Sequence, residues 1–399
     1  MKRAILYLTL FSCILSLPAW SQAVAPDPTR LSVGARILGM GKTFIGLSDD
    51  IGAIYTNPAG LANLDKWQLS SMSGKFMEDY NYLNFSGAYP TKYGVLGFGY
   101  ALSSIAGGYA TKIKTGTSAD PVYEIDPSQP TISYDNNVMV FSYGNKIPLS
   151  FLSSIETSAG ANLKLFSAKM AGDGITSGGA NGQELDIGCL FKIKPWFSFG
   201  STLQDALPFS MGGKLSYASG HEESYPSTWR NGIALKILGE KDALRVYGLQ
   251  ELKFLFDVDS YPTRKNFPLI CHTGIEWSPV KMVAVRAGID QDASGDGNGT
   301  GLSAISNMTA GVGVNFEGFS FDYAYHQYAN VPGITNNYFS LSYTPIPKPS
   351  KVAAPAPAPL PSPPPVITIS EKSKPAPVTI KKVKPASKKT KPAAKKRRK

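Results

Sequence analysis

Seven ionisable side chains stand at alternate positions of extended segments, on the face opposite a run of apolar side chains. Successive side chains of an extended chain point to opposite faces, so these seven are expected on polar faces. Oppositely charged neighbours there can form ion pairs that hold the segments together. We expect the polar faces to carry Lys164, Glu184, Asp186, Arg230, Arg286, Asp322 and His326.

Two of these side chains could also bind a ligand. The guanidinium group of arginine pairs with a carboxylate through two parallel hydrogen bonds. Arg230 and Arg286 are therefore candidates to hold the head group of a fatty-acid-like molecule. An ion-paired polar face and a carboxylate-binding pair are alternative interpretations of the same residues.

Catalytic chemistry is not expected from this set. Asp322 and His326 lie four residues apart on one strand face, which separates them by roughly 13 Å along the strand. They cannot form a hydrogen-bonded dyad with each other, and none of the three histidines of the chain has a serine positioned beside it. We predict no enzyme activity, no catalytic residue and no cofactor.

The segment DQDASGDG, from Asp290 to Gly297, begins like the calcium loop of an EF-hand. Its alternate positions offer oxygen ligands, but the twelfth position is Gly301 instead of the bidentate glutamate. A polar external loop is the plainer interpretation. Whether this loop binds calcium stays open, and no metal ligand is assigned.

Strands are the elements that position these side chains. Alternation of apolar and polar residues begins after residue 66 and continues to Tyr343. It is clearest in 319–326, where Phe and Tyr alternate with Ser, Asp, Ala and His. We expect about fourteen strands, each about long enough to cross a bilayer when tilted. They lie near 67–76, 81–90, 93–102, 136–146, 157–167, 182–192, 196–206, 226–238, 244–254, 270–278, 281–289, 306–316, 318–326 and 336–344.

Composition favours a barrel over a helical globule. The chain has 11% aromatic residues and 39 glycines, and past its first residues it has no run of about 18 uncharged apolar residues. A soluble β-sandwich also alternates, but a membrane barrel additionally carries aromatic side chains at its strand ends. We expect an all-β fold: a transmembrane antiparallel β-barrel of about 14 strands with an N-terminal plug and a disordered C-terminal tail.

The stretch from Gly34 to Leu64 is too rich in glycine for a regular helix and too aperiodic for a strand. Its recurring Leu, Ile, Met and Phe must be buried against something, which predicts a plug. Within it, NPAG is a turn device, because Asn bonds to nearby backbone, Pro fixes φ and Gly accepts positive φ. The plug motif consists of Gly39, Gly41, Asp49, Asp50, Asn57, Pro58, Ala59 and Gly60.

This stretch resembles the N-terminal hatch of FadL-type outer-membrane transporters and, more closely, the start of the PorV/PorQ family, where a GAR..GMG.T..GL.DD..A...NPAGLA.L pattern is usual. The resemblance continues through YPSTWRNGIAL (225–235), WSPVKMVAVRAGID (277–290) and FSFDYAYHQY (319–328). The Gly/Asn/Asp-rich segment 291–305 departs from it as a long insertion. The resemblance implies a ligand pocket in the lumen and a plug that moves to gate it.

The two ends of the chain differ in kind. Residues 1–23 have the charged start, apolar stretch and small-residue cleavage site of a signal peptide. Residues 348–399 hold 15 of the 40 basic residues and only one of the 29 acidic ones, which leaves the remainder with a net charge of −3. We expect a signal peptide (1–23), a plug (24–66), a barrel (67–344) and a disordered, Pro/Ala/Lys-rich tail (345–399).

Two functions from different classes follow from the resemblance. In the first, the barrel sits in the outer membrane of a bacterium and lets hydrophobic, fatty-acid-like molecules pass. In the second, it is a component of a type IX-like secretion system that holds exported proteins at the membrane. The basic tail is expected in the periplasm, with peptidoglycan or periplasmic proteins as partners, and not on nucleic acid.

Overall fold

The computed structural model describes residues 25–346 except 31–33, 77–79, 110, 118–119, 129–130, 150–153, 173–174, 176–177, 265, 296–300 and 330–334. The expected signal peptide (1–23) and all but the first two residues of the expected tail lie outside the described residues. Among the described residues, no helix is long and apolar enough to cross a membrane.

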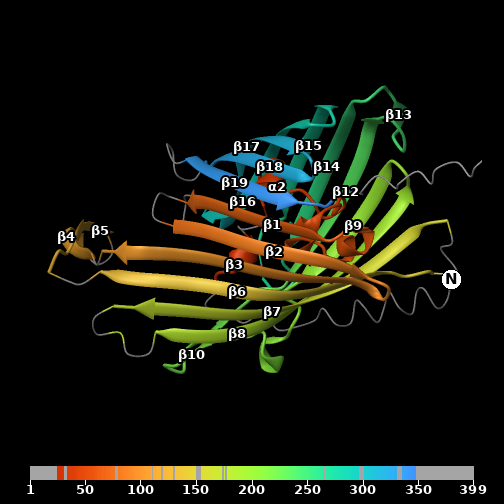
Figure 1. The fold of residues 1–399 in the computed structure, drawn as a ribbon. Helices are drawn as coiled ribbons and strands as arrows, with labels where there is room; N and C mark the ends of the chain where they lie inside the picture. The colour runs from red at the N-terminus through yellow and green to blue at the C-terminus, as the bar shows by residue number, and fades with distance from the viewer. Residues whose placement is uncertain are drawn as a thin grey trace, which may run out of the picture. The chain divides into compact units, whose positions relative to one another are not determined.

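Fourteen antiparallel strands form a closed barrel, in which β1 pairs with both β2 and β19 (Figure 1). The main sheet has 17 strands, and three of them, β10, β11 and β13, are short additions at strand ends. The barrel strands are β1 (Gln68–Phe76), β2 (Tyr80–Thr91), β3 (Gly94–Gly108), β6 (Ile132–Lys146), β7 (Glu156–Ala171), β8 (Gly179–Lys194), β9 (Phe197–Gln204), β12 (Thr228–Gly239), β14 (Glu251–Ser260), β15 (Ile270–Val280), β16 (Val283–Gly295), β17 (Leu302–Phe316), β18 (Phe319–Gln327) and β19 (Thr335–Tyr343).

The two ends of the barrel differ in their connections. At one end, two-residue turns at 92–93, 195–196, 281–282 and 317–318 join neighbouring strands. The longer connections 147–155 and 240–250 also lie at this end. The remaining connections lie at the other end and include the hairpin of β4 (Thr111–Thr117) and β5 (Asp120–Ile125) and the pair β10 (Lys214–Tyr217) and β11 (Glu222–Ser224). We call these the short-turn end and the loop end. The first strand of the barrel starts, and the last strand ends, at the short-turn end.

The outer face of the wall is apolar. Side chains that alternate with the buried ones are exposed and hydrophobic, and they include Leu83, Phe85, Phe98, Met139, Phe141, Leu163, Leu165, Ile187, Ile275, Val285, Val312, Phe321, Phe339 and Leu341. Near the short-turn end the ring of Tyr343 contacts the rings of Trp67 and Phe319. An apolar band flanked by aromatic side chains is the lipid-facing surface of a transmembrane β-barrel.

The predicted strands match the observed ones except at one position. The prediction of a strand at 244–254 was wrong, because β14 occupies Glu251–Ser260 instead. Only Arg245–Val246 of the first part is extended, as the short β13 beside β12. The two acidic residues Asp257 and Asp259 make the sequence after 254 resemble that of a polar loop. Both carboxylates instead point into the lumen and are buried there.

The insertion expected at 291–305 is largely strand. β16 continues to Gly295 and β17 starts at Leu302, and their pairing runs without a break to that hairpin end. The alternation there is weak because both strands extend past the apolar band, where neither face contacts lipid.

The plug lies inside the barrel and consists of three short helical turns. They are α2 (Ala35–Leu38), the 3-10 turn η2 (Ile51–Tyr55) and the 3-10 turn η3 (Pro58–Asn63); a further 3-10 turn, η1 (Pro28–Arg30), precedes them, and η5 (Phe209–Met211) lies near β10. Apolar plug side chains such as Leu38, Phe44, Ile54 and Leu61 are buried in one cluster with inward side chains of the wall. Burial of that cluster holds the irregular segment in place.

A belt of glycines on the inner wall lets the backbone of the plug approach the strands. Its members are Gly144, Gly160, Gly188, Gly200, Gly232, Gly274, Gly288 and Gly311. Several are direct partners on adjacent strands, such as Gly144 with Gly160 and Gly200 with Gly232. A Cβ atom at Gly144 would stand 2.7 Å from the Pro58 carbonyl oxygen, so a larger residue would displace the plug.

Candidate functional site

The side chain of Arg36 on α2 joins the plug to the wall. Its Nε and Nη2 atoms donate to the two carboxylate oxygens of Glu276 on β15, at 2.9 and 2.8 Å. Its Nη1 atom donates to Asp49, at 2.7 Å, and to Asp50. Glu276 also accepts from Arg286 at 2.8 Å and is buried. We call the pair of Arg36 and Glu276 the latch.

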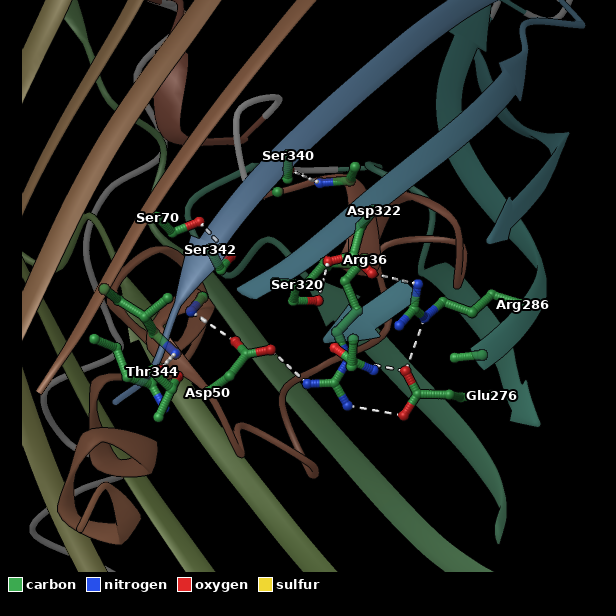
Figure 2. A pocket seen from close by; sticks show the side chains of 18 of the residues that line it. Arg36, Asp50, Ser70, Glu276, Arg286, Ser320, Asp322, Ser340, Ser342 and Thr344 are labelled. Atoms are coloured by element: carbon green, nitrogen blue, oxygen red, sulfur yellow. Dashed lines mark hydrogen bonds and ion pairs between the residues drawn. The ribbon is translucent and has the colours of Figure 1, made fainter. Parts of the chain in front are cut away.

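A cavity of about 310 Å³ lies beside the latch at the short-turn end. It is bounded by the plug and by inward side chains of β1 and β14–β19, and we call it the rim pocket (Figure 2). Its lining is rich in hydroxyl groups and paired charges, among them Ser70, Ser320, Ser340, Ser342, Thr344, Asp50, Glu276, Arg286 and Asp322. Arg286 donates to Asp322 at 2.7 Å, so the pocket contains no guanidinium without a carboxylate partner.

A second set of ion pairs joins the plug to the wall around Asp290. The carboxylate of Asp290 is 2.7 Å from the ammonium group of Lys42 and 2.8 Å from a ring nitrogen of both His272 and His326. All of these wall side chains are buried. One plug cation thus shares a wall carboxylate with two histidines.

A third set lies toward the loop end and holds the segment before the plug. Lys164 contacts Asp27 at 3.1 Å, Asp186 at 3.0 Å and Asp205. Arg30 donates to Asp205 at 2.7 Å. Burial raises the pKa of Asp205, but the charges of Lys164 and Arg30 outweigh that effect and hold its pKa below the ordinary value.

Hydrogen bonds from wall side chains fix the backbone of the later part of the plug. Asp257 accepts from the backbone N–H groups of Phe44 and Ile45 at 2.8 and 3.0 Å. The amide of Asn162 donates to the Ile54 carbonyl at 2.9 Å. Asn57, which caps η3, donates to the carbonyls of Ile45 and Cys189, both at 3.0 Å.

On the loop side of the plug the lumen is lined by aromatic side chains. Tyr82, Phe166, Tyr225 and Tyr338 are buried, and further tyrosines pack against them. The rings of Phe166 and Tyr225 stack with centroids 4.2 Å apart. This aromatic cluster comprises Tyr80, Tyr82, Tyr134, Phe166, Tyr217, Tyr225 and Tyr338.

The structure buries all seven side chains expected on polar faces: Lys164, Glu184, Asp186, Arg230, Arg286, Asp322 and His326. It brings Lys164 to Asp186 and Arg286 to Asp322. It does not bring Arg230 to Arg286, because Arg230 pairs with Asp259 on β14. Glu184 instead accepts from the backbone N–H of Leu207, at 3.1 Å.

The plug motif residues have distinct places. Asp50 and Asn57 cap η2 and η3, Pro58 starts η3, and Ala59 is buried. Asp49 pairs with Arg36. Gly39 faces Gly311, with an added Cβ 3.1 Å from its Cα atom, while Gly41 has φ +65° and Gly60 approaches Ser48.

Several site residues were missed from the sequence. They are Arg36, Lys42, Asp205, Asp259, His272, Glu276 and Asp290 as partners in these ion pairs, and Asp257 as the acceptor of two backbone N–H groups of the plug. Alternation could have found Glu276 and His272, since both share the inward parity of Gly274. The first residue of the calcium-like segment, Asp290, is occupied by Lys42 and the histidines, and residues 296–300 of the same hairpin lie outside the described part.

No protein-family model matches the sequence, and no curated protein matches it significantly. Similar solved structures include the toluene transporter TbuX of Ralstonia pickettii, with 12% identity, 78% of this chain and 98% of that chain covered, and a TM-score of 0.48. The toluene transporter TodX of Pseudomonas putida has 12% identity, 82% and 98% coverage and a TM-score of 0.48. A FadL homologue of Pseudomonas aeruginosa has 11% identity, 81% and 99% coverage and a TM-score of 0.45.

Proposed function

We propose that this protein is a bacterial outer-membrane channel for the passive transport of hydrophobic small molecules of fatty-acid-like character. The aromatic cluster inside the lumen carries the proposal. The lumen of a water-filled porin is polar, whereas tyrosine and phenylalanine side chains offer an apolar surface to a solute. The plug fills the lumen next to this cluster, which is the arrangement of a closed and gated channel.

Uptake into proteoliposomes tests this function. We expect the purified protein to increase the rate at which a long-chain fatty acid enters, with no effect on a sugar of similar mass. Replacing Tyr82 and Tyr225 with alanine should reduce fatty-acid entry severalfold, because it removes two buried rings of the cluster. Tyr123→Ala on the exposed β5 strand is the matched control. Equal entry of both solutes would contradict the proposal.

The secretion alternative rests on the sequence resemblance alone. Mass spectrometry of the protein purified from outer membranes in mild detergent separates the two functions. A bound fatty acid at equal stoichiometry supports the transport function. Exported proteins that copurify in fixed ratio, without an apolar ligand, would support the secretion function instead.

We also propose that the tail is periplasmic. Strand β19 ends at Tyr343 at the short-turn end, and bacterial outer-membrane barrels place their short turns in the periplasm. The tail's lysines and arginines suit an anionic polymer such as peptidoglycan. Full-length protein should sediment with isolated peptidoglycan, and a chain ending at Thr344 should not. If both sediment alike, the tail is not the binding element, and periplasmic proteins become the partners to examine.

A further inference from the structure

The inner face of β17–β19 connects the rim pocket with the aromatic cluster through aligned rows of side chains. The register places these residues side by side, and successive inward rows are roughly 7 Å apart. From the short-turn end, the rows are Asn315, Ser320 and Ser342; then Gly313, Asp322 and Ser340; then Gly311, Ala324 and Tyr338; then Thr309, His326 and Asn336.

Only the third row separates the rim pocket from the aromatic cluster. The side chains of the first two rows, in which Gly313 has none, line the pocket. Tyr338 of the third row already belongs to the aromatic cluster. The other two residues of this row, Gly311 and Ala324, have no side chain and a single methyl group. They leave a space between the rim pocket and the aromatic cluster, which residues of the plug fill.

The part of the plug that fills this space is α2. Gly39 stands against Gly311, and the N–H of Ala35 donates to Ser340 Oγ at 2.8 Å. Thr309 also donates to the carbonyl of Gly39, at 3.3 Å, and the latch adds an ion pair between α2 and the wall. Beside the apolar burial of Ile37 and Leu38, the latch is the ion pair described between α2 and the wall.

The later part of the plug is attached differently. Backbone groups between residues 44 and 57 bond to Asp257, Asn162 and other wall side chains, and the belt glycines of β6–β9 pack against Ile45 and residues 57–62. Moving this part would break several buried hydrogen bonds at once and expose the atoms packed against the belt. Opening at α2 disrupts fewer such contacts.

We propose that solutes pass the plug along the inner face of β17–β19, between the aromatic cluster and the rim pocket, and that α2 is the segment that moves aside. This route rests on the transport function proposed above. The aromatic cluster then receives the solute, the Gly311–Ala324 row is the constriction, and the hydroxyl-lined rim pocket is the exit. The latch keeps the constriction closed.

Cysteine reactivity in proteoliposomes tests the route. The background carries Cys189→Ser and Cys271→Ser, which removes both free thiols of the described barrel. Ala324→Cys reports on the constriction, and Ala101→Cys, equally buried on β3, is the matched control. We expect N-ethylmaleimide to modify Cys at 324 at least about tenfold faster than at 101, because local opening governs access to a buried thiol. Ser340→Cys is a second, nearly isosteric reporter on the same face.

Two further steps weaken the latch and block the constriction. Glu276→Gln should accelerate modification at 324 and 340 and leave the rate at 101 unchanged. Bulky maleimides attached at 324 should then abolish most fatty-acid entry. Equal rates at 324 and 101, or entry that survives complete modification at 324, would overturn the route while leaving transport intact. Selective modification at 324 in a protein that admits no fatty acid would instead refute the transport function and retain α2 as a moving segment.

Discussion

Arg36 and Glu276, 240 residues apart in the chain, meet in a two-point contact with both nitrogen-to-oxygen distances below 3 Å. Glu276 is almost fully buried, and its carboxylate oxygens also accept hydrogen bonds from Arg286 and Lys253. Two parallel charge-assisted hydrogen bonds fix the orientation of a guanidinium group as well as its position. This contact sets where the first helical turn of the plug lies against the wall.

Removing the guanidinium group should loosen that turn. Arg36→Ala leaves Glu276 with its other two cations, so we expect a loss of about 1–2 kcal/mol, below the full cost of an uncompensated buried charge. The barrel should stay folded, and leakage of a small apolar dye through proteoliposomes should rise. Lys112→Ala, in the exposed ion pairs of the β4–β5 hairpin, is the control and should change neither property. Unchanged leakage in Arg36→Ala would show that the latch does not restrain the plug.

The amide of Asn57 offers a sharper test of the fixed part of the plug. Asn57→Asp keeps the oxygen that caps η3 but replaces the donor that bonds the carbonyls of Ile45 and Cys189. A buried carboxylate against two carbonyl oxygens should be destabilising by more than about 2 kcal/mol. Heat-modified mobility on gels measures this, and Asn57→Ala should be less harmful than Asn57→Asp. The reverse order would mean that capping, and not the two carbonyl contacts, is what Asn57 contributes.

Side chains added to the glycine belt should displace the plug. An added Cβ at Gly200 would overlap the Ile45 carbonyl, and one at Gly144 would press on Pro58. We expect Gly200→Ala and Gly144→Ala to preserve the barrel but to make residues of the plug accessible to protease. Gly179→Ala on β8, where no atom lies within 4 Å, is the control. Protection equal to that of the unsubstituted protein would mean that the wall can yield at these positions.

Acid should release the segment that precedes the plug. The pKa of Asp205 is lowered in the folded protein, so its pairing with Arg30 and Lys164 contributes stability above the unfolded pKa of about 4. That contribution is lost as the pH falls through the lower, folded pKa. Hydrogen exchange at residues 25–30 should therefore increase below about pH 4. Asp205→Asn should exchange faster already at neutral pH and show less dependence on acid.

Alternation predicted the strands of the wall except β14. The strand expected at 318–326 is β18, Phe319–Gln327, because its aromatic and small polar side chains alternate strictly. The same parity placed Arg286, Asp322 and His326 inside. Alternation tells which face of a strand a side chain is on, but not how far along the barrel axis it lies relative to side chains of other strands. It therefore could not show that His326 contacts Asp290 while Asp322 contacts Arg286.

The plug contacts were beyond sequence reasoning for a different reason. The motif predicted that Asn57 bonds to nearby backbone, and it accepts from the N–H of Ala59. Its longer-range partners depend on how an irregular segment lies in a closed cylinder. Lys42 reaches Asp290 and Arg36 reaches Glu276 only because the chain enters the lumen in one particular orientation, and no local pattern specifies that orientation.

The glycine belt limits how the sequences of plug and wall can change in evolution, in addition to its role in packing. Each of the strands β6–β9, β12 and β15–β17 has a glycine where the plug passes. The positions of glycines on eight separate strands therefore match the path of one particular plug. A plug taken from another barrel would follow a path that does not match these glycines. A barrel without its plug would expose the strand backbone at the glycines to water. The two parts must therefore change together, and a graft of one without the other has to rebuild the wall.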